Sequence, residues 1–107
     1  MKYRVQLTHE LMWDLTELSD YLVINFSETL SMKVLSELFD IFDSLAEFPY
    51  SGKDASFLMF TFEGYMYLPL KKNVVFYTIN EEKKAVTLLR LFSVNEDPMQ
   101  KFKEYLE

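Results

Sequence analysis

The sequence predicts an α+β fold in which a pair of helices packs on one face of an antiparallel sheet. Three observations indicate this fold: a short alternating segment opens the chain, two amphipathic helical segments follow, and strand-like segments joined by short turns come last. Consecutive strands with short connections pair antiparallel, because parallel pairing requires a long crossover. The chain of 107 residues is too short for two cores, so we expect one domain over residues 1–107.

The first strand is predicted over residues 2–7, where Tyr3, Val5 and Leu7 alternate with polar residues. The spacing then becomes helical, with leucines at positions 11, 15, 18 and 22 on one stripe. Thr8 offers a hydroxyl that can cap this helix. A strand followed directly by a capped amphipathic helix is therefore expected at the N-terminus.

A second helix is predicted roughly from Glu28 to Glu47, with Ser27 as its cap. Its apolar arc is wider than contact with one neighbouring helix requires, so it is expected to face both the first helix and the sheet. The two helices form an αα-hairpin in this interpretation. The segment FPYSG (48–52) then ends the helical half, because proline and glycine interrupt regular structure.

Strands are predicted over most of residues 57–92. FLMFTF (57–62) and YMYLPL (65–70) are separated by Glu63–Gly64, which is either a turn or a bulge in one long strand. VVFYTI (74–79) is apolar on both faces, as in a central strand. NEEKK (80–84) closes a hairpin to the last strand.

The last strand, AVTLLRLF (85–92), alternates in a way that places Val86, Leu88, Arg90 and Phe92 on one face. Asp97 and Pro98 are typical of the start of a short C-terminal helix. With the helical hairpin on one face, the chain is expected to leave the other sheet face uncovered. That face, with Arg90 and several aromatic residues, is expected to meet a substrate, a protein partner or water.

Composition excludes several classes of function. The absence of cysteine excludes disulfides and thiol chemistry and fits a reducing cytoplasm. No apolar run is long enough to cross a membrane, so we expect a cytoplasmic protein without a membrane partner. The single histidine, His9, stands at a helix start without an acidic ligand set around it, so no metal and no cofactor are expected.

Charge is distributed unevenly along the chain. The formal net charge is -6, which disfavours a broad electrostatic grip on nucleic acid. Between His9 and Asp54 there are ten acidic residues against two lysines, whereas the remainder carries nine basic and seven acidic residues. Solvated helix faces explain most of the acidic half. A polyanionic partner would have to meet the other half.

Arg90 is the first candidate for a functional residue. A guanidinium on an open sheet face can bind a phosphate, a carboxylate or an acidic partner residue. An ion pair with a carboxylate on a neighbouring strand is the structural alternative. Tyr67 and Tyr77 are predicted on neighbouring strands, where a phenol is an acid, a base or a packing residue. Lys71 and Lys72 lie in a turn and are either solvated or in contact with an anion.

These segments together resemble the RelE/ParE superfamily of toxins from bacterial type II toxin–antitoxin systems. The resemblance covers most of the chain: KYRVQLT, DLTELSDYL, FDSLAEFPYSGK and EGYMYLPLKKNVVFYTINEEKKAVTLLRLF, in that order. It implies a small toxin that a cognate antitoxin keeps inactive, in a possible hetero-oligomer. RelE-like members cleave mRNA on the ribosome with basic and phenolic residues of the open sheet face, whereas ParE-like members poison DNA gyrase.

Carried over by position, Arg90 matches the arginine of the last strand in this superfamily. Where the superfamily commonly has a further arginine, near Gly64, this chain has Met66 and Tyr67, and after Arg90 it has FSVNED instead of histidine, tyrosine or arginine. Phosphodiester cleavage needs a base, an acid and positive charge at the phosphate. The missing cations favour a ParE-like toxin that binds gyrase.

Two alternatives stay open. One is a ribosome-dependent endoribonuclease with a reduced catalytic set of Arg90, Tyr77 and Tyr67, and the other is a relative that binds only its antitoxin. The residues expected to contact the target or the antitoxin carry positive charge or large apolar side chains: Arg90, Lys71, Lys72, Phe57, Phe60 and Phe92.

Overall fold

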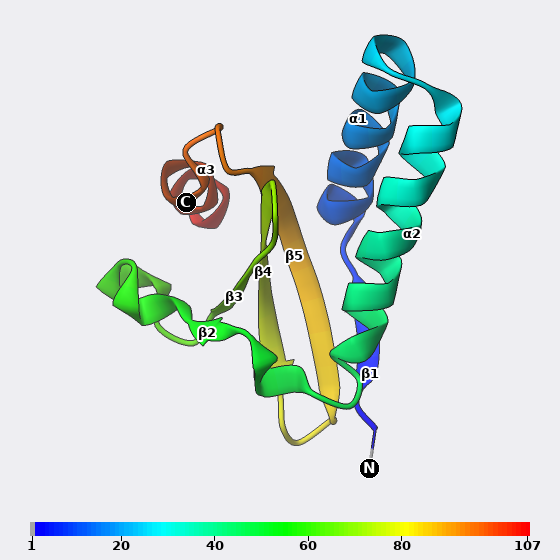
Figure 1. Ribbon diagram of the computed structural model, residues 1–107. Helices are drawn as coiled ribbons and strands as arrows, with labels where there is room; N and C mark the ends of the chain where they lie inside the picture. The colour runs from blue at the N-terminus through cyan, green and yellow to red at the C-terminus, as the bar shows by residue number, and fades with distance from the viewer. Residues whose placement is uncertain (1) are drawn as a thin grey trace.

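The computed structural model describes residues 2–107 and confirms the predicted fold class (Figure 1). The helices and strands follow the chain in the order β1 Arg4–Leu7, α1 His9–Asn25, α2 Glu28–Ser44, β2 Lys53–Asp54, β3 Met66–Pro69, β4 Asn73–Asn80, β5 Ala85–Ser93 and α3 Pro98–Leu106. Short 3₁₀ turns lie at Pro49–Ser51, Ala55–Phe57 and Phe60–Phe62.

The sheet contains five strands in residues 2–107, in the spatial order β1-β5-β4-β3-β2. β1 is parallel to β5, with Val5 opposite Val86, and the other neighbours pair antiparallel. The parallel pair follows from the chain path, because the αα-hairpin and three strands separate β1 from β5 and supply the long crossover. β4 and β5 lie in the middle of the sheet and contain its most deeply buried residues.

The two long helices begin where the sequence predicts. The Thr8 hydroxyl accepts a hydrogen bond from the backbone N–H of Leu11 at 3.0 Å, and the Ser27 hydroxyl accepts one from Leu30 at 3.0 Å. Each cap satisfies a donor that has no partner inside its helix. α2 ends at Ser44 rather than near Glu47, because the following backbone closes into tight turns in which the Leu45 N–H donates to the Phe42 carbonyl at 3.1 Å.

The hairpin of α1 and α2 covers one face of the sheet, and we call this side the hairpin face (Figure 1). Apolar residues of the helices meet inward residues of β4 and β5 there. The buried members of this cluster are Leu11, Leu15, Leu38, Phe42, Leu45, Val75, Tyr77, Val86, Leu88 and Leu91. The predicted orientation of Tyr3, Val5 and Leu7 is confirmed, since all three pack against this cluster.

The opposite side of the sheet is also covered, which corrects the prediction of an open face. α3 lies across it (Figure 1), and Phe102 stacks on Phe76 with ring centroids 4.0 Å apart. We call this side the α3 face, and its buried cluster is Ala55, Phe62, Phe76, Phe92 and Phe102. The sequence did predict α3 and its start at Pro98, but not that this helix packs on the sheet. Phe102 of α3 covers this face together with Phe62 of the preceding turns, and each buried Phe removes a large apolar area from water.

The segment 57–62 is not a strand, which corrects a second prediction. The Asp54 carboxylate accepts hydrogen bonds from both the backbone N–H and the hydroxyl of Ser56, at 2.9 and 2.7 Å, and bends the chain into a turn after the two residues of β2. Phe62 enters the core while Phe57 and Phe60 point outward, 88% and 84% exposed. The apolar run FLMFTF therefore lies partly in the core and partly in solvent, and Phe62 is its only fully buried residue.

Candidate functional site

A β-bulge in β5 decides where Arg90 points. Phe76 of β4 pairs with Arg90, but the next residue, Tyr77, pairs with Leu88, so Leu89 is an extra residue. Leu88 consequently faces the hairpin, whereas Arg90 and Phe92 lie on the α3 face. The predicted common face of Val86, Leu88, Arg90 and Phe92 is therefore wrong. Arg90 and Phe92 lie on the side opposite the hairpin, as predicted, but Val86 and Leu88 face the hairpin, because simple alternation does not survive a bulge.

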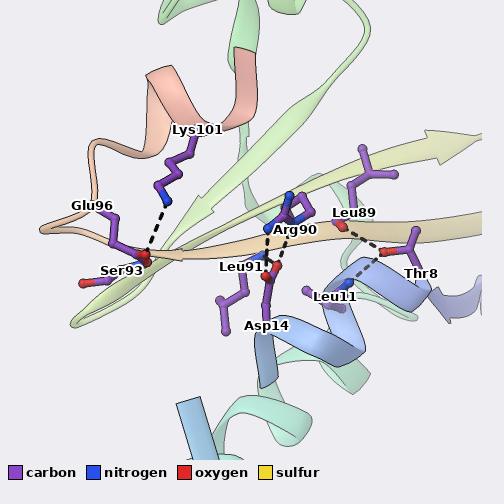
Figure 2. Close-up of polar contacts among 9 residues, drawn as sticks. All are labelled: Thr8, Leu11, Asp14, Leu89, Arg90, Leu91, Ser93, Glu96 and Lys101. Carbon is purple, nitrogen blue, oxygen red and sulfur yellow. Dashed lines mark hydrogen bonds and ion pairs between the residues drawn. The ribbon is translucent and has the colours of Figure 1, made fainter. Parts of the chain in front are cut away.

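Helix α1 covers the edge of β5 that β1 leaves free. β1 ends at Leu7, which pairs with Leu88. The next residue, Thr8, also forms hydrogen bonds to β5. The Thr8 backbone N–H donates to the Leu88 carbonyl at 3.1 Å. The Thr8 hydroxyl donates to the Leu89 carbonyl at 2.8 Å (Figure 2). The N-cap of α1 thus also fixes the bulged strand.

Asp14, six residues after Thr8, binds Arg90 through two parallel hydrogen bonds (Figure 2). The guanidinium Nε donates to Asp14 Oδ2 at 2.8 Å and Nη2 donates to Oδ1 at 2.9 Å. The backbone N–H of Leu91 also donates to Oδ2, at 2.9 Å. Three donors therefore converge on one carboxylate, and the bond to Asp14 raises the pKa of Arg90 above its usual value.

The two charged groups of this pair are largely withdrawn from solvent, with 24% of the Arg90 and 11% of the Asp14 side chain exposed. The guanidinium carbon lies 4.7 Å from the Phe92 ring centroid and 5.3 Å from that of Tyr105. Aromatic faces stabilise a cation in this position. The sequence interpretation included an ion pair for Arg90, but with a strand carboxylate, and the partner is a helix residue.

Asp14 and Tyr105 are the residues of this site that sequence reasoning missed. A signal for Asp14 was present, because it stands three residues after Leu11 and four before Leu18, on the apolar stripe of α1. An acid on a stripe that faces the core needs a cationic or hydrogen-bonding partner.

Tyr77 lies on the hairpin face and is fully buried. Its hydroxyl donates to the Pro49 carbonyl at 2.8 Å and accepts from the Gly52 backbone N–H at 3.1 Å. Burial raises the pKa of this phenol. A Cβ at position 52 would lie 2.5 Å from the Tyr77 hydroxyl oxygen, so glycine is required by this close approach. Tyr77 therefore holds the 3₁₀ turn Pro49–Ser51 against the sheet through these two hydrogen bonds.

Tyr67 lies on the α3 face and is half-buried, but Phe76 separates it from Arg90. Within the sheet register Phe76 pairs with Tyr67 on one side and with Arg90 on the other, and Phe102 covers Phe76. The three residues expected to be catalytic are therefore not brought together, since Tyr77 points to the opposite face.

The residues expected to make contacts fall into two groups. Lys71 and Lys72 are exposed in the turn between β3 and β4, and Phe57 and Phe60 are exposed beside β2. Phe92 is only 3% exposed and packs in the α3-face cluster.

A shallow groove of about 230 Å³ runs between the outer sides of α1 and α2. Its lining is mostly apolar with small hydroxyl residues and one acid: Met12, Leu15, Thr16, Ser19, Asp20, Leu35 and Phe39. Within residues 2–107 no three His, Asp or Glu side chains are grouped so that they could hold a metal ion. None of the helices in that range combines the length and apolar character needed to cross a membrane.

The arrangement of the sheet, the helical hairpin and a short C-terminal helix is that of the RelE/ParE superfamily of toxins. The family model described as "ParE toxin of type II toxin-antitoxin system, parDE" matches residues 5–98. The chain belongs to this family. No curated protein matches the chain.

Solved structures share the fold at low identity. The chromosomal ParDE toxin–antitoxin system of Pseudomonas aeruginosa is similar at 16% identity and a TM-score of 0.71, over 87% of this chain and 97% of that one. The RelBE2 toxin–antitoxin complex of Mycobacterium tuberculosis is similar at 20% identity and a TM-score of 0.62, over 87% and 99%. The family match and the fold agree.

Proposed function

We propose that this toxin inhibits growth by binding a protein target, DNA gyrase, rather than by cleaving RNA, and that a cognate antitoxin neutralises it. The observation that carries the proposal is the state of Arg90. The cation that corresponds to the superfamily's last-strand arginine is already paired with Asp14 through two short hydrogen bonds.

Phosphodiester cleavage requires positive charge that is free to stabilise the developing charge on the phosphate. Arg90 keeps N–H groups that are not bonded to Asp14, but the carboxylate neutralises its charge. To offer an uncompensated cation, Arg90 would have to break both bonds and leave a carboxylate of which only 11% is exposed without its cation. Leaving a mostly buried charge unpaired costs several kcal/mol. The pair therefore favours a structural role for Arg90 and disfavours nucleolytic chemistry.

The phenols support the same conclusion. A general acid and a general base must both reach the scissile phosphate within hydrogen-bond distance. Tyr77 is buried on the hairpin face with both of its hydrogen bonds satisfied, and Tyr67 is separated from Arg90 by Phe76. Binding a protein surface needs no such convergence, and it agrees with membership of the ParE family.

Two exposed apolar surfaces suit an antitoxin segment. One is the outward pair Phe57 and Phe60 beside the edge strand β2, and the other is the groove between α1 and α2 that includes Leu35 and Phe39. Exposed apolar patches of this kind mark interaction sites. The ParDE and RelBE2 structures with the same fold are toxin–antitoxin systems, which supports an antitoxin as the occupant here.

The test uses purified protein in two parallel assays. Gyrase supercoiling activity should fall as the toxin is added, and ribosomes programmed with mRNA should show no new cleavage products at the same concentrations. Arg90→Lys should retain the gyrase effect, because it keeps the charge beside Asp14. Cleavage of the programmed mRNA without any effect on gyrase would contradict the proposal and establish the endoribonuclease.

A further inference from the structure

The free end of the helical hairpin carries a group of exposed apolar side chains that has no role in the core. We call Tyr21, Val23, Ile24 and Phe26 the hairpin tip; their exposed fractions are 57%, 40%, 80% and 62%. Tyr21 and Phe26 contact each other edge to face, with ring centroids 6.2 Å apart. Figure 1 shows the turn between α1 and α2 projecting beyond the end of the sheet.

The fold does not require this extension. Leu18 is the last residue of α1 that packs against the hairpin-face cluster, yet the helix continues to Asn25. Seven further residues lengthen a helix by about 10 Å. In that extension only Leu22 is buried, and a hydrogen bond between the hydroxyls of Ser19 and Ser31, at 2.9 Å, joins the two helices. The exposed apolar residues thus lie on a helical projection whose two helices contact each other.

The charge around the hairpin tip limits what can bind it. α1 and α2 together contain eight acidic residues and one lysine, and Glu17, Asp20 and Glu28 are the acids nearest the turn in sequence. A second copy of this chain would bring acids against acids, and like charges at an interface disfavour association. A partner with lysines or arginines around an apolar pocket is complementary.

We infer that the hairpin tip is the surface with which this toxin contacts its target protein, by inserting Ile24 and Phe26 into an apolar pocket bordered by basic residues. This inference rests on the proposed function and deepens it, because it separates the target surface from the surfaces assigned to the antitoxin. A small aromatic and aliphatic cluster at the centre of an interface carries most of the binding energy, and the acids around it increase the association rate.

Phe26→Ser and Phe48→Ser form a matched pair for the test. Both replace a phenylalanine that is 62% or 63% exposed, and they lie at opposite ends of the hairpin, at the turn after α1 and after the end of α2. Binding of each variant to purified gyrase is measured by surface-immobilised kinetics. Phe26→Ser is expected to weaken binding about tenfold or more, as for a central contact residue. Phe48→Ser is expected to bind like the unmodified protein.

Charge reversal provides a second comparison. Asp20→Lys is expected to slow association with gyrase several-fold at low salt, whereas Asp40→Lys, on α2 and farther from the turn, is expected to have a smaller effect. Thermal unfolding checks that each variant is folded. Ile24→Ser replaces Phe26→Ser if the latter unfolds, since Ile24 is 80% exposed.

The outcomes distinguish a wrong contact surface from a wrong target protein. Gyrase binding that survives both Ile24→Ser and Phe26→Ser overturns the hairpin tip and leaves the proposed function intact. Absence of gyrase binding by the unmodified protein overturns the proposed function and the tip's assigned partner with it. A self-associated toxin that becomes monomeric in Phe26→Ser identifies a second copy as the occupant and contradicts the inference.

Discussion

The two faces of the sheet are covered in different ways. On the hairpin face, two helices of 17 residues each bury a mainly aliphatic cluster that spreads over α1, α2, β4 and β5. On the α3 face, a helix of nine residues covers an aromatic cluster, and Phe102 is the only α3 residue that is fully buried. The helices of the hairpin face contribute several buried side chains, whereas the buried contribution of α3 is a single side chain, that of Phe102. Substitution of one buried helix residue should therefore destabilise the α3 face more than the hairpin face.

Phe102→Ala is expected to have the largest effect on stability. Removal of a buried phenylalanine costs about 3–5 kcal/mol, and here it also removes the stacking on Phe76. Urea unfolding measures the loss. A loss below about 1 kcal/mol, within the range of a surface substitution, would mean that α3 does not depend on this contact.

Asp14→Asn is expected to cause the second-largest loss in the free energy of unfolding. It keeps the shape of the side chain but removes the charge that binds Arg90, and a hydrogen bond between charged groups is worth about 1.5–3 kcal/mol. Asp40→Asn, on the exposed side of α2, is the control and should change the free energy of unfolding by less than about 0.5 kcal/mol. Equal effects of the two substitutions would contradict the assigned role of Asp14.

Tyr77→Phe is expected to lower the free energy of unfolding more than Tyr67→Phe, although the sequence suggested a similar role for both tyrosines. Loss of the Tyr77 hydroxyl leaves the Pro49 carbonyl and the Gly52 N–H without their partner, at a cost of about 1–3 kcal/mol, whereas Tyr67→Phe should cost less than about 0.5 kcal/mol. Urea unfolding of both variants checks the difference. Growth inhibition by Tyr77→Phe is expected to persist at temperatures where the variant is folded; its loss in a folded protein would restore a chemical role for this phenol.

The smallest expected effect concerns the rim of the hairpin face, where Glu81 accepts hydrogen bonds from Tyr50 and Tyr3 and pairs with Lys84. These bonds lower the pKa of Glu81 from 4.5 to about 2, and the bond from Tyr50 has the largest effect. A lowered acid pKa stabilises the folded state fully above 4.5, and this contribution is lost as the pH falls from 4.5 towards 2. Stability of the unmodified protein should thus decline more steeply over that range than that of Glu81→Gln. Parallel curves would show that Glu81 contributes nothing.

The hairpin face could be predicted from the sequence because its signals are local. Thr8 and Ser27 cap the helices, and the leucine spacing of α1 identifies its buried stripe. The place of β1 beside β5 could not be predicted in this way, because the pair joins segments from opposite ends of the chain.

The α3 face could not be predicted in the same way. FLMFTF has the composition of a strand, and only the hydrogen bonds of Asp54 to Ser56 show why the chain turns there. The bulge at Leu89 leaves no mark in the apolar pattern of β5, yet it places Leu88 and Arg90 on opposite sides of the sheet. Arg90 forms a largely buried ion pair, and its partner Asp14 is 76 residues away in sequence.

The central claim is that this ParE family toxin acts on a protein target and not on RNA. It is tested most directly by expressing the toxin without an antitoxin in a bacterial host and pulse-labelling new DNA and new protein in the same culture. DNA synthesis is expected to fall first, together with a DNA-damage response. A fall in protein synthesis that precedes any change in DNA synthesis would contradict it and favour an endoribonuclease. Unimpaired growth with folded toxin present would also contradict it and favour a relative that only binds its antitoxin.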